Sequence, residues 1–110
     1  MLMDIQFQPK YYFITVFERL DISKYGFPIY DAVRCWGFYT DKEVATKALH
    51  ENWTDMEEGI YKYAVIEEYR EGISGMTGHR QFFKFDDERE GYFEIDEPEG
   101  YKHFAGFAFG

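Results

Sequence analysis

The chain has 110 residues, a formal net charge of −9, 45% hydrophobic residues and 22% aromatic residues. An intrinsically disordered chain is excluded, because disordered segments lack the aromatic side chains that a buried core requires. A chain of this length forms one domain, here residues 1–110, and it needs no disulfide or metal ion to fold.

The negative charge is concentrated in residues 86–100, which carry eight acidic side chains and one basic side chain, Arg89. A surface of this kind repels a phosphate backbone, which argues against direct nucleic-acid binding. It favours a basic protein as the partner.

The chain contains one cysteine, Cys35, so no internal disulfide can form. This fits a reducing cytoplasm. Met1–Met3 is followed at once by Asp4, which does not resemble a secretory signal. No apolar run approaches the roughly 18 residues of a membrane span. The sequence therefore predicts a cytoplasmic protein without a membrane segment.

Runs of β-branched and aromatic residues predict five strands, over residues 11–20, 32–40, 61–70, 80–87 and 91–96. In the second strand, the alternation places Cys35 between Val33 and Gly37 on an apolar face and predicts that its thiol is buried. The segments that carry glycine or proline, 21–31 and 71–79, are predicted to be loops.

The C-terminal segment, residues 98–110, is predicted to be a last edge strand or an extended tail. In either form it would dock its phenylalanines, which are Phe104, Phe107 and Phe109.

A helix is predicted from about Asp41 to Asn52. Thr40 and Glu43 have the spacing of a capping box, and an apolar stripe follows them. The stripe consists of Val44, Ala45, Ala48 and Leu49. One helix cannot cover both faces of a parallel sheet. The predicted fold is therefore α+β, with a mostly antiparallel twisted sheet of five to six strands in the order ββαβββ and one main helix packed on one face.

Several segments occur in an order that resembles a family of small uncharacterised bacterial proteins found in Firmicutes and mobile elements. They are "RCWGFYTDKEVATKAL", "YKYAVIEEYREGI", "QFFKFD" and the terminal "FAGFAFG". The resemblance covers about residues 11–110 and implies a bacterial or phage origin. It carries no activity over to this chain.

The sequence gives only weak signals for a catalytic or ligand-binding site. Cys35 as a nucleophile would need a nearby base, and none of the three histidines lies in a recognisable motif. The glycine-rich segment 71–79 leads into a strand rather than into the helix that follows a phosphate-binding loop. Glu67 and Glu68 point to opposite faces of their strand, so solvated carboxylates at a strand end are predicted. If either is buried, Arg34 or Arg80 is the expected partner. No cofactor and no dedicated metal site are expected.

The aromatic side chains exceed what one small core can bury, and aromatic residues are enriched in protein interfaces. The alternative is that tyrosine rings lie half-covered on the sheet. The candidate interaction surface combines aromatic and acidic side chains: Trp53, Tyr61, Tyr63, Asp86, Asp87, Glu88, Glu94, Asp96 and Glu97.

These features favour a non-enzymatic adaptor or inhibitor that binds a protein partner, with the acidic side chains steering it toward a basic surface. A homodimer is compatible with the same surface. The alternative is a small enzyme or ligand-binding protein with a pocket between helix and sheet, near Cys35, Trp36 and His50.

Overall fold

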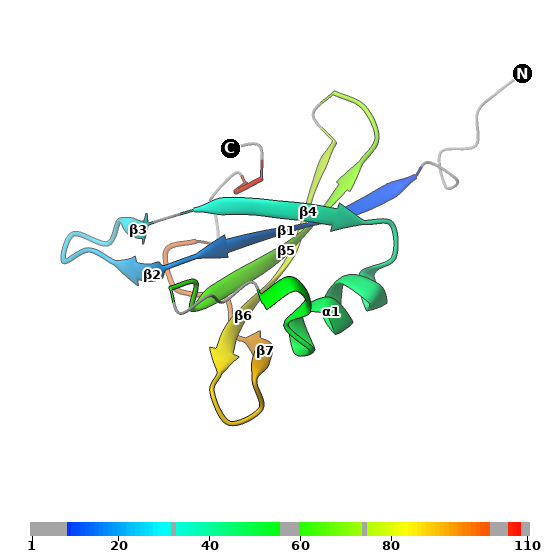
Figure 1. Ribbon diagram of the computed structural model, residues 1–110. Helices are drawn as coiled ribbons and strands as arrows, with labels where there is room; N and C mark the ends of the chain where they lie inside the picture. The colour runs from blue at the N-terminus through cyan, green and yellow to red at the C-terminus, as the bar shows by residue number, and fades with distance from the viewer. Residues whose placement is uncertain (1–8, 32, 56–59, 74, 102–105, 109–110) are drawn as a thin grey trace, which may run out of the picture.

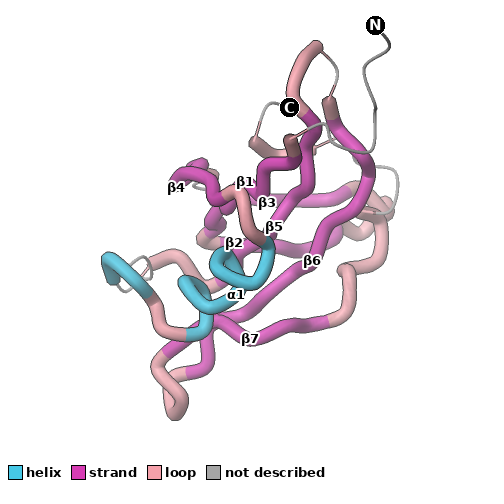
Figure 2. The backbone as a smooth tube through the Cα atoms, turned by 90° about the vertical axis from the view of Figure 1, so that its right-hand side faces the viewer, coloured by secondary structure: helices cyan, strands magenta, loops and turns pink. Residues whose placement is uncertain are grey.

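The computed structural model describes residues 9–31, 33–55, 60–73, 75–101 and 106–108. Its elements, in chain order, are the strands β1 (Lys10–Phe17), β2 (Arg19–Ile22), β3 (Pro28–Asp31) and β4 (Arg34–Tyr39), the helix α1 (Lys42–His50), the short 3₁₀ helix η2 (Trp53–Asp55), and the strands β5 (Tyr63–Arg70), β6 (Met76–Asp86) and β7 (Gly91–Ile95). Figure 2 shows the helical segments in cyan; among the described residues these are α1 and η2, which lie between β4 and β5 in chain order. In the described ranges, no helix is long and apolar enough to cross a membrane.

Five strands form an antiparallel sheet in the order β4–β1–β5–β6–β7 (Figure 1). β1 and β5 are flanked by strands on both sides, which fits their apolar sequences. The predicted α+β class, with one main helix on a mostly antiparallel sheet, is confirmed. Within this sheet and its helix, the chain order is ββαβββ, as expected.

The face of the sheet that α1 covers, here called the helix face, holds the larger core cluster. Ala45, Ala48 and Leu49 of the helix are buried against it. The sheet side of the cluster includes Ile14, Val16, Ala64, Ile66, Phe83 and Tyr92. The predicted stripe is thus confirmed for three of its four residues, and Val44 is half-buried.

The helix begins one residue later than the predicted capping box requires. Asp41 is the N-cap, and its Oδ1 accepts a hydrogen bond of 2.8 Å from the Glu43 backbone N–H. This bond satisfies one of the free N–H groups of the first turn. The prediction of Thr40 as the cap was therefore wrong.

The opposite face of the sheet holds a second cluster, with Phe17, Val65, Phe82, Tyr101 and Phe107. It is covered by a hairpin and by the C-terminal segment rather than by a helix. β2 and β3 pair as a separate two-stranded sheet. β2 begins at the end of the predicted strand 11–20, and the rest of this sheet lies in residues 21–31, which were predicted to be a loop. That prediction was wrong, because Gly26 and Pro28 mark a turn between two short strands.

The C-terminal half follows the predicted hairpin of β6 and β7 closely. β6 begins at Met76, so the predicted glycine-rich loop is shorter than expected. In the C-terminal tail, Phe107 is buried as predicted. Residues 101 and 106–108 form no strand. Phe104 and Phe109 lie outside the described residues.

For two side chains, the burial in the structure is the opposite of the burial predicted from the strand pattern. Cys35 is exposed, because β4 is an edge strand and a bulge at Trp36 interrupts its pairing with β1. The prediction of a buried thiol was wrong. Glu67 is 3% exposed rather than solvated, and the partners that make this burial tolerable come from the far end of the chain.

Candidate functional site

The β2–β3 hairpin extends beyond one end of the main sheet (Figure 1). Its strands pair antiparallel from Arg19 with Asp31 to Ile22 with Pro28. The Glu18 N–H donates to the Asp31 carbonyl at 3.0 Å and extends the ladder by one residue. Pro28 is the first residue of its strand, a position where the missing N–H does little harm.

Hydrogen bonds fix the backbone of the turn, residues 23–27. The Ser23 N–H donates to the Phe27 carbonyl at 2.7 Å, and the Gly26 N–H donates to the Ser23 carbonyl at 2.9 Å. The Ser23 Oγ accepts from the N–H groups of Tyr25 at 3.2 Å and Phe27 at 3.1 Å. Gly26 has φ of 84°, a left-handed conformation that glycine adopts without strain. The turn is therefore preorganised.

Two aromatic side chains project from this turn. Tyr25 is 74% exposed and Phe27 is 68% exposed. Lys24 lies beside the first ring, with its Nζ 5.2 Å from the ring centroid. We call Tyr25 and Phe27 the aromatic tip. Large aromatic side chains on a fixed backbone lose little conformational entropy on binding, and they are the side chains that most often dominate protein interfaces.

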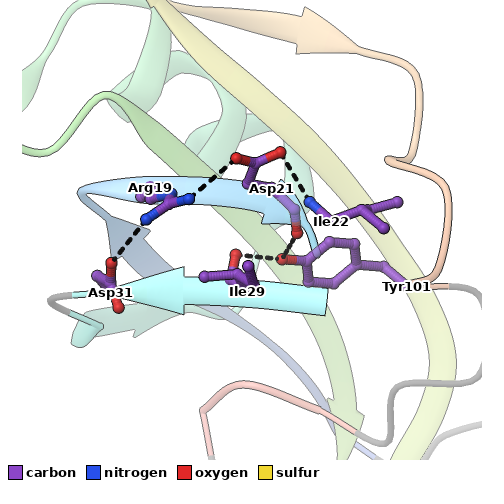
Figure 3. Close-up of polar contacts among 6 residues, drawn as sticks. All are labelled: Arg19, Asp21, Ile22, Ile29, Asp31 and Tyr101. Carbon is purple, nitrogen blue, oxygen red and sulfur yellow. Dashed lines mark hydrogen bonds and ion pairs between the residues drawn. The ribbon is translucent and has the colours of Figure 1, made fainter. Parts of the chain in front are cut away.

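Tyr101 braces the base of the hairpin from the C-terminal segment. Its hydroxyl oxygen lies 2.7 Å from the Ile29 carbonyl oxygen and 3.1 Å from the Asp21 carbonyl oxygen, so one donor serves both strands (Figure 3). Burial raises the pKa of this hydroxyl, which keeps its proton in place for donation.

Charged groups on the outer side of the hairpin form a small network. Arg19 contacts Asp21 at 3.1 Å and Asp31 at 3.7 Å, and Asp21 also accepts from the Ile22 N–H at 2.8 Å (Figure 3). The Ile22 N–H, followed by Arg19, holds the pKa of Asp21 below its ordinary value. These side chains are more than half exposed, so the ion pairs contribute little stability. The Arg19–Asp31 pair joins the two strands at a register position, whereas the Arg19–Asp21 pair lies within β2.

The apolar side of the hairpin packs on the opposite face of the sheet. Leu20 and Ile22 lie against the second core cluster. The ring of Tyr30 contacts Phe17 at 6.1 Å and Phe107 at 5.7 Å between centroids, both edge to face. The hairpin is thus tied to the domain at its base while its tip remains exposed.

The aromatic residues of the predicted surface are dispersed. Tyr61 is only 8% exposed and belongs to the core of the helix face. Trp53 is half-buried against Tyr39 and donates from Nε1 to Glu51 at 2.9 Å. Tyr63 is half-buried on the opposite face, with Lys84 5.8 Å from its ring centroid.

The acidic residues of the predicted surface divide into two groups. Asp86 caps the β6–β7 turn: its Oδ1 accepts from the N–H groups of Glu88 and Arg89, at 2.9 and 3.1 Å. The Arg89 backbone and side chain are the main reason that the pKa of Asp86 lies below its ordinary value. Glu97 pairs with Arg80 at 3.1 Å. Three others are exposed along the hairpin: Asp87, Glu94 and Asp96, together with the side chain of Glu88.

Of the three residues near which a pocket was predicted, Cys35, Trp36 and His50, the last lines a groove of about 470 Å³ between α1 and β6–β7, which the other two do not line. The His50 Nδ1 lies 2.8 Å from the Tyr92 carbonyl oxygen, and its ring stacks on Phe93 at 4.6 Å. Trp36 packs on the helix face, whereas Cys35 pairs in register with Thr15. In the described part of the chain, no three His, Cys, Asp or Glu side chains come together as a metal site.

The aromatic tip was not included in the predicted interaction surface. The signal that would have found it is Ser23, followed three residues later by Gly26, between short apolar stretches on either side. A search for similar proteins gives no match to a family model, a curated protein or a solved structure.

Proposed function

We propose that this protein is a non-enzymatic adaptor or inhibitor that binds a protein partner through the aromatic tip of the β2–β3 hairpin. The observation that supports this proposal is the exposure of Tyr25 and Phe27, at 74% and 68%, on a turn whose backbone Ser23 holds in place. A preorganised turn lowers the entropic cost of binding, and the two rings supply the apolar area. Such a tip fits an apolar pocket on the partner.

The partner we propose is basic around that pocket. The net charge of −9, most of it in residues 86–100, favours encounter with a positively charged surface. The resemblance to proteins of Firmicutes and mobile elements makes a bacterial or phage setting part of the proposal. A single cysteine is compatible with a reducing cytoplasm there.

Site-specific photo-crosslinking in bacterial cells tests this function. A photo-reactive phenylalanine derivative replaces Tyr25 or Phe27, and the matched control carries it at Ile73, which is 99% exposed in the loop after β5. The proposal predicts an adduct with one defined protein from either tip position and no such adduct from position 73. Equal labelling from all three positions, or none from the tip, would argue against the tip as the contact.

A further inference from the structure

Glu67 of β5 is a buried carboxylate that holds the end of the chain. It is 3% exposed and lies on the opposite face of the sheet. Its Oε1 and Oε2 each accept a hydrogen bond of 3.0 Å from the Phe107 N–H, and Oε1 accepts another of 3.0 Å from the Ala108 N–H. Two successive backbone donors thus converge on one carboxylate.

The groups around this carboxylate only partly offset the rise in its pKa that burial causes. Burial raises the pKa of Glu67, against the opposing effects of the Ala108 and Phe107 N–H groups, of Arg80 and of Tyr69. Arg80 is its register partner on β6 and also contacts Glu97 and the Tyr101 carbonyl. A buried carboxylate is costly, and its retention here is explained by the backbone groups that it binds.

The three residues that dock on Glu67 fit their site closely. Phe107 is 8% exposed, and its ring lies 4.6 Å from Phe17 and 5.9 Å from Phe82 between centroids. A Cβ at Gly106 would come within 2.9 Å of both the Tyr69 hydroxyl and the Met76 sulfur. The site therefore accepts a glycine followed by an aromatic residue, and we call residues 106–108 the C-terminal latch.

The latch reaches the hairpin by two contacts. The Phe107 ring packs edge to face on Tyr30 of β3, at 5.7 Å. It also lies 6.0 Å from the ring of Tyr101, whose hydroxyl bonds to the backbone of both hairpin strands. The hairpin is outside the main sheet, so these contacts replace the neighbouring strands that would otherwise fix its position.

We propose that Glu67 is a positioning residue: by docking the C-terminal latch, it fixes the β2–β3 hairpin and with it the aromatic tip. The importance of that position for binding rests on the proposed function, but the coupling itself does not. A protein in which the latch is released keeps its sheet and its helix while the hairpin opens more often. The tip would then lose its preorganisation without any change in its own residues.

Hydrogen exchange on the full-length protein, followed by NMR, tests this coupling without a partner. In Glu67→Gln one carboxylate oxygen becomes an NH₂ group, which cannot accept from the backbone donors. We expect the amides of Phe107 and Ala108, and the hairpin amides of Glu18 and Ser23, to exchange at least about tenfold faster. The amides of Ile14 and Ile66, inside the main sheet, should keep their rates.

Three further variants make the result specific. Gly106→Ala keeps the Glu67 carboxylate but places a Cβ 3.4 Å from its Oε2 and 2.9 Å from the Tyr69 hydroxyl, which crowds the latch. It should reproduce the selective opening of the hairpin even if Glu67→Gln folds poorly. Tyr101→Phe should accelerate exchange in the hairpin but not at Phe107 or Ala108, because it removes only the hydroxyl. Leu49→Ala controls for a general loss of stability and should accelerate exchange in all elements.

Two results would overturn the proposal. One is hairpin exchange at the wild-type rate in both Glu67→Gln and Gly106→Ala. The other is equal acceleration at Ile14, Ile66 and the hairpin, which would show that Glu67 only supports the sheet. Neither result bears on the role of the aromatic tip in binding, which the photo-crosslinking experiment tests separately.

Discussion

The β2–β3 and β6–β7 hairpins of this domain have turns that are held in the same way, but the side chains that they expose are chemically opposite. In the β2–β3 turn the Ser23 Oγ accepts two backbone N–H groups, and in the β6–β7 turn the Asp86 Oδ1 does the same. The first turn exposes Tyr25 and Phe27, whereas the second exposes acidic side chains. The hairpins extend in different directions in Figure 1, so contact and electrostatic steering can be served by separate parts of one small domain.

The hairpins also differ in what holds them. The β6–β7 hairpin belongs to the main sheet, and Tyr92 is fully buried against α1 and donates to the Tyr61 carbonyl at 2.7 Å. The β2–β3 hairpin forms its own small sheet and depends on Tyr101 and Phe107 from the end of the chain. The acidic hairpin is therefore fixed by the main sheet and its helix, and the aromatic hairpin is fixed by packing on the second cluster, to which Tyr101 and Phe107 contribute from the end of the chain.

The largest loss of stability is expected from a change in the core of the helix face. The β6–β7 hairpin contributes to this core, and the β2–β3 hairpin does not. Leu49→Ala removes a fully buried side chain between α1 and the sheet and should cost about 2–5 kcal/mol. Chemical denaturation measures the change. A loss below about 1 kcal/mol would show that the helix face is not the main core.

A pH titration separates Glu67 from the hairpin carboxylates. Because the folded-state pKa of Glu67 is raised above its ordinary value of 4.5, the folded protein binds this proton more tightly than the unfolded chain. The contribution of Glu67 to stability should therefore fall as pH rises from 4.5 through the folded-state pKa. Asp21 and Asp86 have lowered pKa values, so their stabilisation is instead lost as pH falls below their ordinary value of 3.8.

The free energy of unfolding, measured against pH for wild type and for Glu67→Gln, isolates the contribution of Glu67. The wild-type free energy of unfolding should decline more steeply with rising pH above 4.5 than that of the variant. Parallel curves for the two proteins would contradict the burial of this carboxylate.

A smaller loss is expected at the aromatic turn. Ser23→Ala removes the acceptor of two backbone hydrogen bonds at a partly exposed site and should cost roughly 0.5–1.5 kcal/mol. Asp86→Ala is the matched change in the acidic turn. Exchange of the Tyr25 and Phe27 amides should accelerate only in the first variant, and acceleration in both would mean that the two turns are coupled.

Neutralising exposed acids should affect stability least. Replacing Asp87, Glu88, Glu94 and Asp96 with Asn or Gln spares the capping residue Asp86 and the ion pair of Glu97. The fold should persist, while association with a basic partner slows and its salt dependence flattens. An unchanged association rate at low salt would remove the steering role of this hairpin.

The sequence was sufficient for the main sheet and helix because their signals are local. Strong β-propensity marks β1 and β5, and the change of period after Tyr39 marks α1. The features that define the site depend on contacts across the chain. Glu67 is satisfied by N–H groups 40 residues away, and Tyr101 braces a hairpin about 80 residues before it. Strands as short as β2 and β3 carry too little pattern to stand out beside Gly26 and Pro28.

The most direct test of the central claim is the affinity of the crosslinked partner, once purified, for Tyr25→Ala/Phe27→Ala, with Ile73→Ala as the exposed apolar control. We expect the double variant to unfold within about 0.5 kcal/mol of wild type, because both side chains are exposed. Its Kd should rise at least about 30-fold, mainly through faster dissociation, as for an interface hot spot, and the control should bind like wild type. A Kd within about threefold of wild type for the stable double variant would contradict the claim that the aromatic tip carries the binding.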